Sequence, residues 1–452
     1  MTARRIRQRG ADGPGAGGPP EQDRLPLIHA ALRTAAARHG TPLYLTDETA
    51  IAVAADELRA AFPDPWIRQY SVKANDVPAV IAAVTAEGRG LGANVVSRGE
   101  WAAARAAGVP NARLTLEGIG KTDADLRAAV RSAADGDPIR WLAIESADEA
   151  AVLDRIAARA RLGPGAPGGR GRRAAPSLDI LFRLNPDVTP ETHASLAVGA
   201  GGSKFGMTET ELSAAVEKVV RSGGGLRARG IHLHVGSQLG AVDAWRDAVR
   251  RGLALLALLR GSLEDFDTLD VGGGFPVAPR GEAGPRPERF ARELPALLDT
   301  IPPDRRPGRL AIEPGRFLVA RAGWLVGRVL HVRDRDGRQV VLDTGMTELI
   351  RPALYGGRHA IIALTSLGRP VATWPTGGDE TVDVHGPICE STDALGVHRL
   401  PALRRGDLVA IRDAGAYAAS LSSGYNGRPR PPQVLLRPDG SIVLARRRGS
   451  LR

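Results

Sequence analysis

Lys73, in the stretch IRQYSVKAND (67–76), is the first residue whose type suggests chemistry. Of the 61 lysines and arginines in the chain only four are lysines, at positions 73, 121, 204 and 218. Arginine stays protonated, whereas a buried lysine can lose its proton and act as a nucleophile or form a Schiff base. A lysine kept among so many arginines therefore suggests a reactive amine, with a solvated surface lysine as the plainer alternative.

A glycine-rich segment and an arginine further along the chain suit a phosphate. In LDVGGGFP, Gly272, Gly273 and Gly274 let backbone N–H groups approach an anion without a Cβ in the way. In IEPGR, Arg316 could pair with the same anion, and Glu313 could reach the site or simply form a salt bridge at a strand end. Alone, each of these signals is weak.

The segment HLHVGS adds a third group of candidates. His234 could stack on a planar ring and Ser237 could donate to a phosphate, although a histidine in a strand is often only a satisfied polar residue. A primary amine, a phosphate cradle, an imidazole and a carboxylate at one site together describe pyridoxal phosphate chemistry. We expect no metal site.

The elements that must position these residues are eight short apolar runs. The runs are IRQYSVKAN, LGANVVS, ARLTLEG, RWLAIES, LDILFRLN, GIHLHVG, LDVGGG and RLAIEPG. Helix-period segments such as VPAVIAAVTAEG and AWRDAVRRGLALLALLRG follow most of them, which predicts a (β/α)8 TIM barrel, with an open doubly wound sheet as the alternative. Polar residues at the predicted strand ends are Lys73, Asn94, Glu117, Glu145, Arg183, His234, Gly272 and Glu313.

After residue 317 the pattern changes to strand segments and turns, which predicts a C-terminal all-β domain. Asp-Gly pairs in RDRDGRQ and RPDGSI are typical of β-hairpins. The predicted organisation is a disordered tail (1–24), an N-terminal segment packing on the β domain (25–46), a barrel (47–317) with a flexible insert (163–177), a β domain (318–445) and a basic tail (446–452).

Composition narrows the class of protein. The net charge of +11 invites a nucleic-acid interpretation, but the arginines cluster in the termini and the insert or lie beside acidic residues, so we expect no nucleic-acid partner. No apolar run is long enough to cross a membrane and the N-terminal segment lacks an apolar signal core, so we expect a cytoplasmic protein. The single cysteine, Cys389, excludes an internal disulfide.

The ordered motifs resemble the fold-type III pyridoxal-phosphate decarboxylases, the group of diaminopimelate and ornithine decarboxylases, and most resemble the diaminopimelate enzymes. The matching segments run from about Tyr70 to Val434 and include YSVKAN, NVVSRGEW, RLNPDVTPETH, HLHVGSQL, DVGGGFP, EPGR, DTGMTELIRPALYGGRH, GPICESTDAL and GAYAASLSSGYNGRPRP. The resemblance implies an alanine-racemase-like architecture, with the barrel followed by the β domain, and a homodimer whose active sites lie at the subunit interface.

The resemblance also implies roles for residues of this chain. Catalytic roles would fall to Lys73 as the Schiff-base amine, Cys389 as a proton donor supplied across the dimer, His234 and Glu313. The cofactor would be held by Lys73, His234, Ser237, Gly273, Gly274, Glu313, Pro314, Gly315, Arg316 and Tyr417. The substrate would be held by Arg316, Arg351, Tyr355, Glu390 and Tyr417.

A substrate with a distal ammonium near Glu390 and a distal carboxylate near Arg351 is a diamino dicarboxylic acid. The expected function is therefore decarboxylation of meso-2,6-diaminopimelate to L-lysine and carbon dioxide, in lysine biosynthesis. The alternatives are a paralogous decarboxylase acting on ornithine, lysine or a carrier-tethered amino acid, and a regulatory homologue that binds the cofactor without catalysis. An alanine-racemase-like activity would need a tyrosine base facing the lysine.

Two positions depart from the pattern of many relatives. Asn94 stands where many of them have aspartate, and Glu117 to Lys121, EGIGK, replaces the form HGNNK. These departures keep the paralogue alternative open, whereas Glu390, in CES, favours diaminopimelate.

Overall fold

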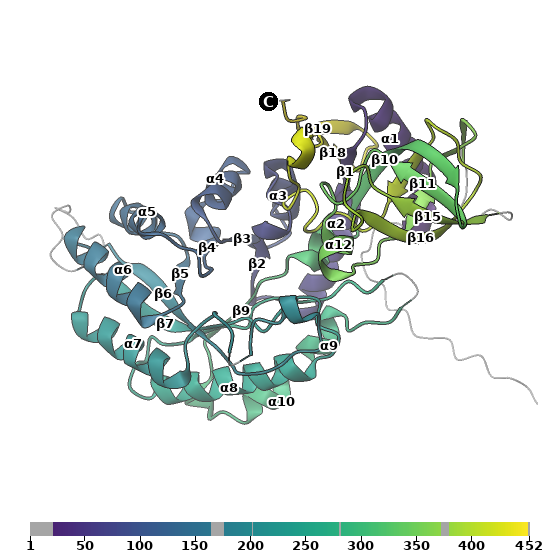
Figure 1. The fold of residues 1–452 in the computed structure, drawn as a ribbon. Helices are drawn as coiled ribbons and strands as arrows, with labels where there is room; N and C mark the ends of the chain where they lie inside the picture. The colour runs from purple at the N-terminus through teal and green to yellow at the C-terminus, as the bar shows by residue number, and fades with distance from the viewer. Residues whose placement is uncertain (1–20, 164–175, 201, 280–281, 372–378, 451–452) are drawn as a thin grey trace, which may run out of the picture.

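The structure is a computed structural model that describes residues 21–163, 176–200, 202–279, 282–371 and 379–450. Figure 1 shows a barrel of strands surrounded by helices, with a separate β domain beside it. The predicted fold class, a (β/α)8 barrel followed by an all-β domain, is confirmed, and the open doubly wound alternative is wrong because the sheet closes on itself.

The barrel strands fall on the eight predicted apolar runs and pair in parallel in chain order. They are β2 (Ile67–Ser71), β3 (Leu91–Val95), β4 (Leu114–Leu116), β5 (Trp141–Ile144), β6 (Leu178–Leu184), β7 (Leu226–Leu233), β8 (Thr268–Asp270) and β9 (Arg309–Ile312). Pairing of Arg68 with Ile312 joins the last strand to the first. Because helices cover the outer face and side chains fill the interior, most residues of these strands are buried, without alternation of buried and exposed positions.

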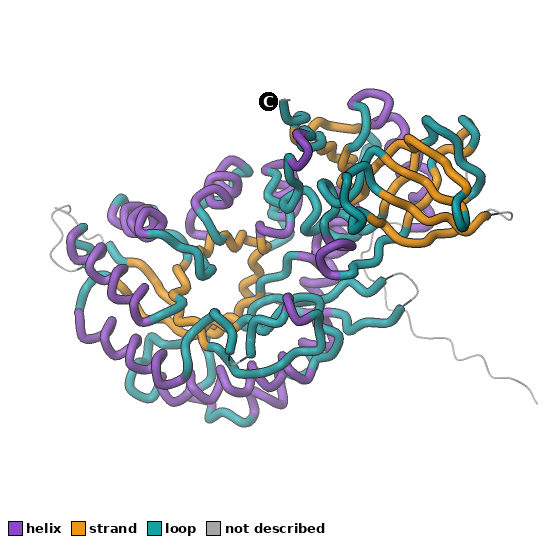
Figure 2. Tube along the Cα trace, in the orientation of Figure 1, coloured by secondary structure: helices purple, strands orange, loops and turns teal. Residues whose placement is uncertain are grey.

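The helices of the barrel unit lie on its outer face (Figure 2). They are α2 (Glu48–Ala61), α3 (Pro78–Val84), α4 (Arg98–Ala106), α5 (Asp123–Ala134), α6 (Ala147–Arg159), α7 (Glu209–Ser222), α8 (Asp243–Arg260), α9 (Pro287–Ala291), α10 (Leu294–Asp299) and α11 (Arg316–Val319). Short 3-10 helices are η1 (Val72–Ala74), η2 (Asn111–Arg113), η3 (Ala194–Leu196), η4 (Pro303–Arg305) and η5 (Tyr425–Gly427). No helix in the described part of the chain is long and apolar enough to span a bilayer.

Side-chain caps start several barrel helices close to the strand ends. Thr122 accepts the Asp125 N–H at the start of α5 while Asp125 accepts the Thr122 N–H, which is a capping box. Ser146 caps α6 in the same way by accepting the Glu149 N–H. Glu149 also accepts the Glu145 N–H at 2.7 Å, so the cap fixes the backbone just after β5. Capping therefore orders the loops at the mouth of the barrel.

The second unit is built on one nine-stranded sheet and includes a short hairpin. Its strands are β1 (Leu43–Asp47), β10 (Gly323–Asp334), β11 (Arg338–Leu342), β12 (Ile361–Ala363), β13 (Thr365–Ser366), β14 (Arg369–Pro370), β15 (Glu380–His385), β16 (Ala394–Leu400), β17 (Leu408–Ile411), β18 (Gln433–Leu436) and β19 (Ile442–Arg446), with α12 (Arg351–Tyr355) between β11 and β12. Both predicted hairpins are present, because β10 pairs with β11 and β18 with β19.

The N-terminal helix α1 (Glu21–His39) packs on this sheet. Leu32 is fully buried in a cluster that includes Trp324 of β10 and Val434 of β18. The prediction of a disordered tail is wrong at residues 21–24, because Arg24 pairs with the buried Asp47 and anchors the first turn of α1. Residues 1–20 of that tail and 164–175 of the predicted insert lie outside the described residues.

Candidate active site

A cavity of about 500 Å³ opens at the carboxyl ends of the barrel strands. Active sites of TIM barrels occupy this face, and the volume is within the usual range for small-molecule sites. Ten predicted site residues line the cavity: Lys73, His234, Ser237, Gly274, Glu313, Gly315, Arg316, Arg351, Tyr355 and Tyr417. Residues at the ends of seven barrel strands and on the β domain thus meet in one space.

Lys73 lies in η1, directly after β2, and is partly buried. Its Nζ forms no hydrogen bond or ion pair with any residue that the structure describes, so the amine is free to react. The β domain holds the backbone on which Lys73 sits, because the Ser420 hydroxyl donates to the Lys73 carbonyl at 3.0 Å and the Tyr417 N–H donates to the Ala74 carbonyl at 2.8 Å. Contacts from the β domain therefore hold the barrel backbone that presents the amine.

The backbone geometry after β8 requires glycine. Gly272 and Gly274 have φ of +71° and +96°, in the left-handed region that glycine adopts most readily. At Gly273 a Cβ would lie 2.2 Å from the Glu313 carbonyl oxygen, and at Gly274 it would lie 2.6 Å from the Gly236 carbonyl oxygen. This loop packs backbone against backbone and leaves no room for larger residues.

Arg316 is a buried cation at the same end of the cavity. Its Nη2 donates to the Ser237 hydroxyl at 3.0 Å and its guanidinium lies 4.7 Å from the centre of the Tyr417 ring. The Nε and Nη1 groups are buried without a partner, and Arg316 forms no ion pair within the described ranges. Burial lowers the pKa of this guanidinium. A bound anion would satisfy both free donors.

His234 follows β7 and is neutral. Burial lowers its pKa well below the usual value, and the nearby charges of Lys73 and Arg183 lower it further. The Gly273 N–H donates to His234 Nδ1 at 3.3 Å, so the ring proton is assigned to Nε2. An uncharged imidazole fixed in this way can stack on an aromatic ring.

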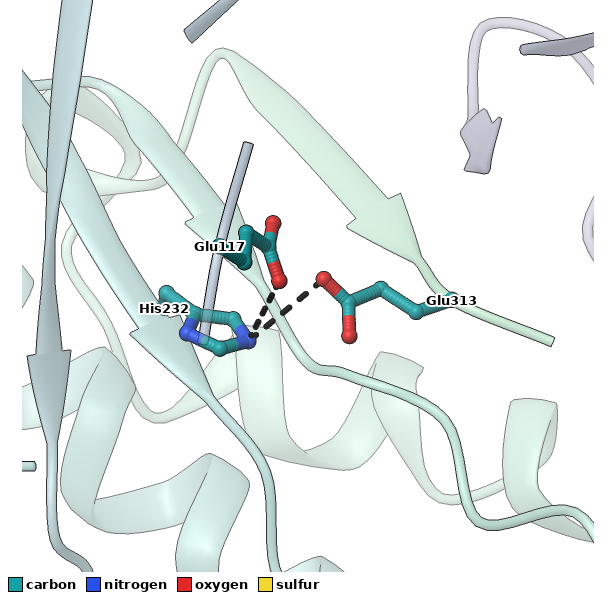
Figure 3. Close-up of side chains that lie close together, drawn as sticks. All are labelled: Glu117, His232 and Glu313. Atoms are coloured by element: carbon teal, nitrogen blue, oxygen red, sulfur yellow. Dashed lines mark ion pairs between the residues drawn. The ribbon is translucent and has the colours of Figure 1, made fainter. Parts of the chain in front are cut away.

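A buried acidic group lies beneath the cavity (Figure 3). Glu117, His232 and Glu313 are each no more than 3% exposed. His232 Nε2 lies 3.3 Å from Glu117 Oε2 and 3.5 Å from Glu313 Oε1, with neither pair in hydrogen-bonding geometry. Asn94 donates to Glu313 Oε1 at 2.5 Å. The ligating atoms of the three ionisable side chains lie within 4.8 Å of one another.

Two negative charges at that spacing would be costly. With an effective dielectric constant of about 20, they repel by about 3–4 kcal/mol. Burial, followed by the charge of Glu313, raises the pKa of Glu117 to about 8. Burial lowers the pKa of His232 to about 4, although the Glu117 carboxylate opposes that effect. One carboxyl of the pair therefore holds a proton at neutral pH.

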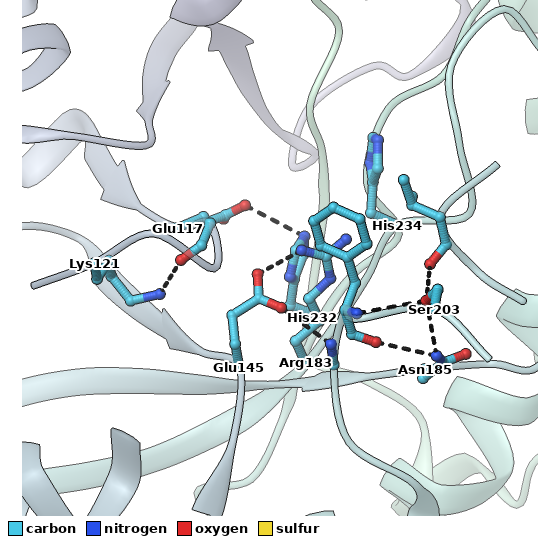
Figure 4. Close-up of polar contacts among 12 residues, drawn as sticks. Glu117, Lys121, Glu145, Arg183, Asn185, Ser203, His232 and His234 are labelled. Carbon is cyan, nitrogen blue, oxygen red and sulfur yellow. Dashed lines mark hydrogen bonds and ion pairs between the residues drawn. The ribbon is translucent and has the colours of Figure 1, made fainter. Parts of the chain in front are cut away.

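Arg183 of β6 is held beside this group by Glu145 (Figure 4). Arg183 lowers the pKa of the Glu145 carboxyl and outweighs the opposing effect of burial, which is the largest single influence. The Arg183 guanidinium also lies 4.8 Å from the centre of the Phe205 ring, and both residues line the cavity. Arg183 is therefore neutralised by its own partner, unlike Arg316.

Arg351, in α12, brings a second cation into the cavity. It forms no ion pair with a carboxylate in the part of the chain that the structure describes, and its Nη1 lies 3.2 Å from His359 Nε2. His359 Nδ1 lies 2.9 Å from the Arg412 carbonyl, which can only accept, so Nδ1 carries the proton and Nε2 accepts from Arg351. Burial and the Arg351 charge lower the pKa of His359 to about 4, which preserves this neutral acceptor.

Cys389 and Glu390 do not line the cavity within this chain. Both are exposed; Asn426 Nδ2 lies 3.5 Å from Cys389 Sγ, and the Tyr425 hydroxyl donates to Glu390 at 2.7 Å. Gly273 and Pro314 lie beside lining residues and shape the site through their backbones. Sequence reasoning overlooked His232 and His359. The HLH spacing could have revealed His232, because residues i and i+2 of a strand share a face.

The residues around the cavity fit pyridoxal phosphate. The free donors of Arg316 suit its phosphate, the glycine loop admits a close approach to the backbone, and Lys73 offers an unpaired amine. Glu313 presents a carboxylate that would suit the cofactor's ring nitrogen, and His234 presents a neutral ring that would suit stacking. A lysine facing an anion cradle at the mouth of a TIM barrel defines a barrel enzyme that binds a phosphorylated aldehyde cofactor.

Comparison with known proteins gives the family. Residues 49–320 match the pyridoxal-binding domain of the pyridoxal-dependent decarboxylases. The chain is 34% identical to a diaminopimelate decarboxylase of Aquifex aeolicus, over 92% of this chain and 91% of the relative. It is 35% identical to the enzyme of that name from Vibrio cholerae, over 95% of each. This chain therefore belongs to the pyridoxal-dependent decarboxylases, whose cofactor is pyridoxal phosphate.

A solved structure is similar over the whole fold. Diaminopimelate decarboxylase from Helicobacter pylori, complexed with L-lysine, has a TM-score of 0.81 and 29% sequence identity to this chain. The match covers 93% of this chain and 97% of the other. The similarity therefore includes both the barrel and the β domain.

Proposed function

We propose that this protein decarboxylates meso-2,6-diaminopimelate to L-lysine and carbon dioxide with pyridoxal phosphate, in lysine biosynthesis. The named relatives support this substrate, as does the L-lysine in the similar solved structure. The observation that carries the proposal is Arg351, a guanidinium without a carboxylate partner in the described chain, in the same cavity as Lys73. A substrate with a second carboxylate would supply that partner.

The cofactor would be held by groups from both units, in the cofactor-binding barrel (47–317) and the β domain (318–445). Bound pyridoxal phosphate supplies an electron sink for the electrons of the bond to the departing carboxylate. The residues assigned to hold it are Lys73, His234, Ser237, Gly273, Gly274, Glu313, Pro314, Gly315, Arg316 and Tyr417. Lys73 contributes the amine, Arg316 and Ser237 the phosphate donors, and Glu313 the partner of the ring nitrogen.

Substrate selection follows from the charges around the cavity. Arg351 is assigned to the distal carboxylate, Glu390 to the distal ammonium, and Arg316, Tyr355 and Tyr417 to the remaining contacts. Ornithine and lysine lack the second carboxylate, so they would leave the Arg351 charge unpaired. Leaving a partly buried charge without a partner lowers affinity more than losing an apolar contact does.

We assign Cys389 as a proton donor that reaches the site of a second subunit in a homodimer. The exposure of Cys389 and Glu390, and their place outside the cavity lining of their own chain, support this assignment. A reduced thiol is needed for such a role, which agrees with a cytoplasmic location. Water exclusion at the cavity would then depend on the partner.

Carbon dioxide release on a panel of amino acids tests the proposal. We expect turnover of meso-diaminopimelate, with kcat/KM at least about 100-fold higher than for lysine, ornithine or arginine, since one unpaired buried charge costs about 3 kcal/mol. LL-diaminopimelate serves as the stereochemical control. Turnover of ornithine or lysine without turnover of meso-diaminopimelate would replace the proposal with the paralogue alternative.

Replacing His359 with leucine should weaken substrate binding. The variant loses the acceptor that orients Arg351, so KM for meso-diaminopimelate should rise about tenfold while kcat changes less, as expected for loss of one hydrogen bond to a charged group. His359→Gln, whose amide oxygen can accept from Arg351, should recover part of the loss. Equal KM values in the wild-type protein and the leucine variant would show that His359 does not position Arg351.

A further inference from the structure

Three buried carboxyl groups lie at the carboxyl ends of the barrel strands, beneath the cavity. No lysine or arginine in the described chain forms an ion pair with them. They are Glu117 after β4, Asp270 of β8 and Glu313 after β9. Neighbouring buried carboxylates differ, since Glu145 pairs with Arg183 and Glu149 with Lys121. The three groups cannot all be ionised so close together without a cation. At least one of them must therefore keep its proton, and the question is which one.

The hydrogen bonds to Glu117 and Glu313 differ, and the difference indicates which of the two carboxyls is ionised. Glu313 Oε1 accepts from Asn94 Nδ2 at 2.5 Å, a contact that stabilises an anion because the amide can only donate there. Glu117 has a long contact from Trp141 Nε1, at 3.4 Å, and the imidazole of His232 at 3.3 Å. Asn94 and Glu313 also interact with its carboxyl, and Glu313, which raises its pKa, outweighs Asn94, which lowers it. Figure 3 shows a Glu117 oxygen facing a Glu313 oxygen across a short gap. Glu313 is therefore the carboxylate with the short hydrogen bond that favours an anion.

The other ionisable groups around Glu117 also favour a protonated Glu117. Burial lowers the pKa of His232 to about 4, so His232 is not the missing cation, and burial with the neighbouring carboxylates raises the pKa of Asp270. The pKa of Glu117 itself is raised to about 8. The ionisable groups that surround this pocket are Lys73 after β2, Glu145 after β5, Arg183 of β6, His232 of β7, Asp270 of β8 and Glu313 after β9.

We propose that Glu117 is a positioning residue held as a neutral carboxylic acid, which leaves Glu313 as the anionic carboxylate beneath the cofactor's ring nitrogen. The role of Glu313 in this inference rests on the proposed function. The protonation state of Glu117 does not, because it is a property of the protein without cofactor or substrate. Ionisation of Glu117 would place a second negative charge next to Glu313. The site would then hold two buried negative charges beneath the ring instead of one, and they would repel each other by about 3–4 kcal/mol.

The first test is the pH dependence of thermal stability in the full-length protein without cofactor. A carboxyl whose pKa is higher in the folded than in the unfolded state contributes stability below its unfolded pKa and loses it as pH rises through the folded value. The melting temperature of the wild type should therefore fall relative to that of Glu117→Gln as the pH rises from about 4.5 to about 8. Above pH 8 the difference between the two melting temperatures should stay constant. Glutamine imitates the neutral acid and has no proton to lose.

The second test is infrared spectroscopy of the same protein. Wild type at pH 7 should show a protonated-carboxyl C=O band that Glu117→Gln lacks, and the band should titrate away with a midpoint near pH 8. Glu211→Gln is the matched control, since Glu211 is an exposed residue of the α7 capping box and glutamine preserves the motif. That control should leave the band unchanged.

A third measurement links the group to the cofactor. Above pH 8, wild type should lose affinity for pyridoxal phosphate relative to Glu117→Gln by up to about tenfold per pH unit, as one proton requires. An unchanged infrared band in Glu117→Gln together with a melting difference that does not vary with pH would overturn the proposal. So would stoichiometric Zn²⁺ binding that Glu117→Gln abolishes, because the three side chains would then be cation ligands. If the protein did not decarboxylate diaminopimelate, the proposed function would fail, but the melting and infrared results on the cofactor-free protein would still support a neutral Glu117.

Discussion

Lys73→Ala should lose both the visible absorption of bound pyridoxal phosphate and decarboxylase activity, the latter by a factor on the order of 10³ or more. The amine of Lys73 is unpaired in the described chain and lines the cavity with the phosphate donors of Arg316. Among the residues that the structure describes, no other lysine lines that cavity, so no other lysine side chain is placed to substitute. The checks are an absorption spectrum and a single-turnover assay of carbon dioxide release.

The chain supplies its own control for this experiment. Lys218→Ala removes an exposed lysine on α7, far along the chain from the motifs of the site, and should leave spectrum and rate unchanged. Added methylamine should restore part of the rate of Lys73→Ala, because a free primary amine can enter the vacated space. A coloured, active Lys73→Ala protein would exclude Lys73 as the reactive amine.

Cys389→Ala should bind the cofactor normally and yet decarboxylate about 10²–10⁴ times more slowly, the usual contribution of a positioned general acid. The thiol is exposed and lies outside the cavity lining of its own chain, so the change should not disturb the cofactor residues. Wild-type rates in Cys389→Ala would remove the proton-donor role.

Co-expression of Lys73→Ala and Cys389→Ala chains tests whether two subunits build each site. In a mixed dimer, one site combines an intact Lys73 with an intact Cys389, and the other has neither. Random assembly makes half of the dimers mixed, so about one quarter of the wild-type activity should return. Activity no higher than that of either variant alone would place both groups in the site of a single subunit.

Much of the barrel could be predicted from sequence because its information is local. Each parallel strand is largely buried, so it appears as a short apolar run, and several are followed by a helix with a capping residue at its start. The sequence predicted that the segment 25–46 packs on the β domain but not that Leu43–Asp47 forms the strand β1, whose place depends on pairing with β10 and β18. Contacts between distant segments leave no local pattern.

The site divides in the same way. Lys73, His234 and Glu313 could be predicted because polar residues at the ends of barrel strands converge on one mouth. His359 could not, since its role depends on a contact with Arg351 and on the carbonyl of Arg412, both set by folding of the β domain. Cys389 has its proposed role only if a second chain is present, and that information is carried by resemblance rather than by any pattern of spacing.

The position of β1 has a consequence for synthesis of the protein. Leu45 pairs with Trp324 on one side and with Val434 on the other, so one of the first strands to leave the ribosome waits for one of the last. The barrel, in contrast, is closed by strands between Ile67 and Ile312. During translation the barrel can form while β1 remains an unpaired apolar edge, which is a surface that chaperones recognise. Ribosomes stalled before Gln433 should therefore carry a folded barrel beside an unfinished sheet.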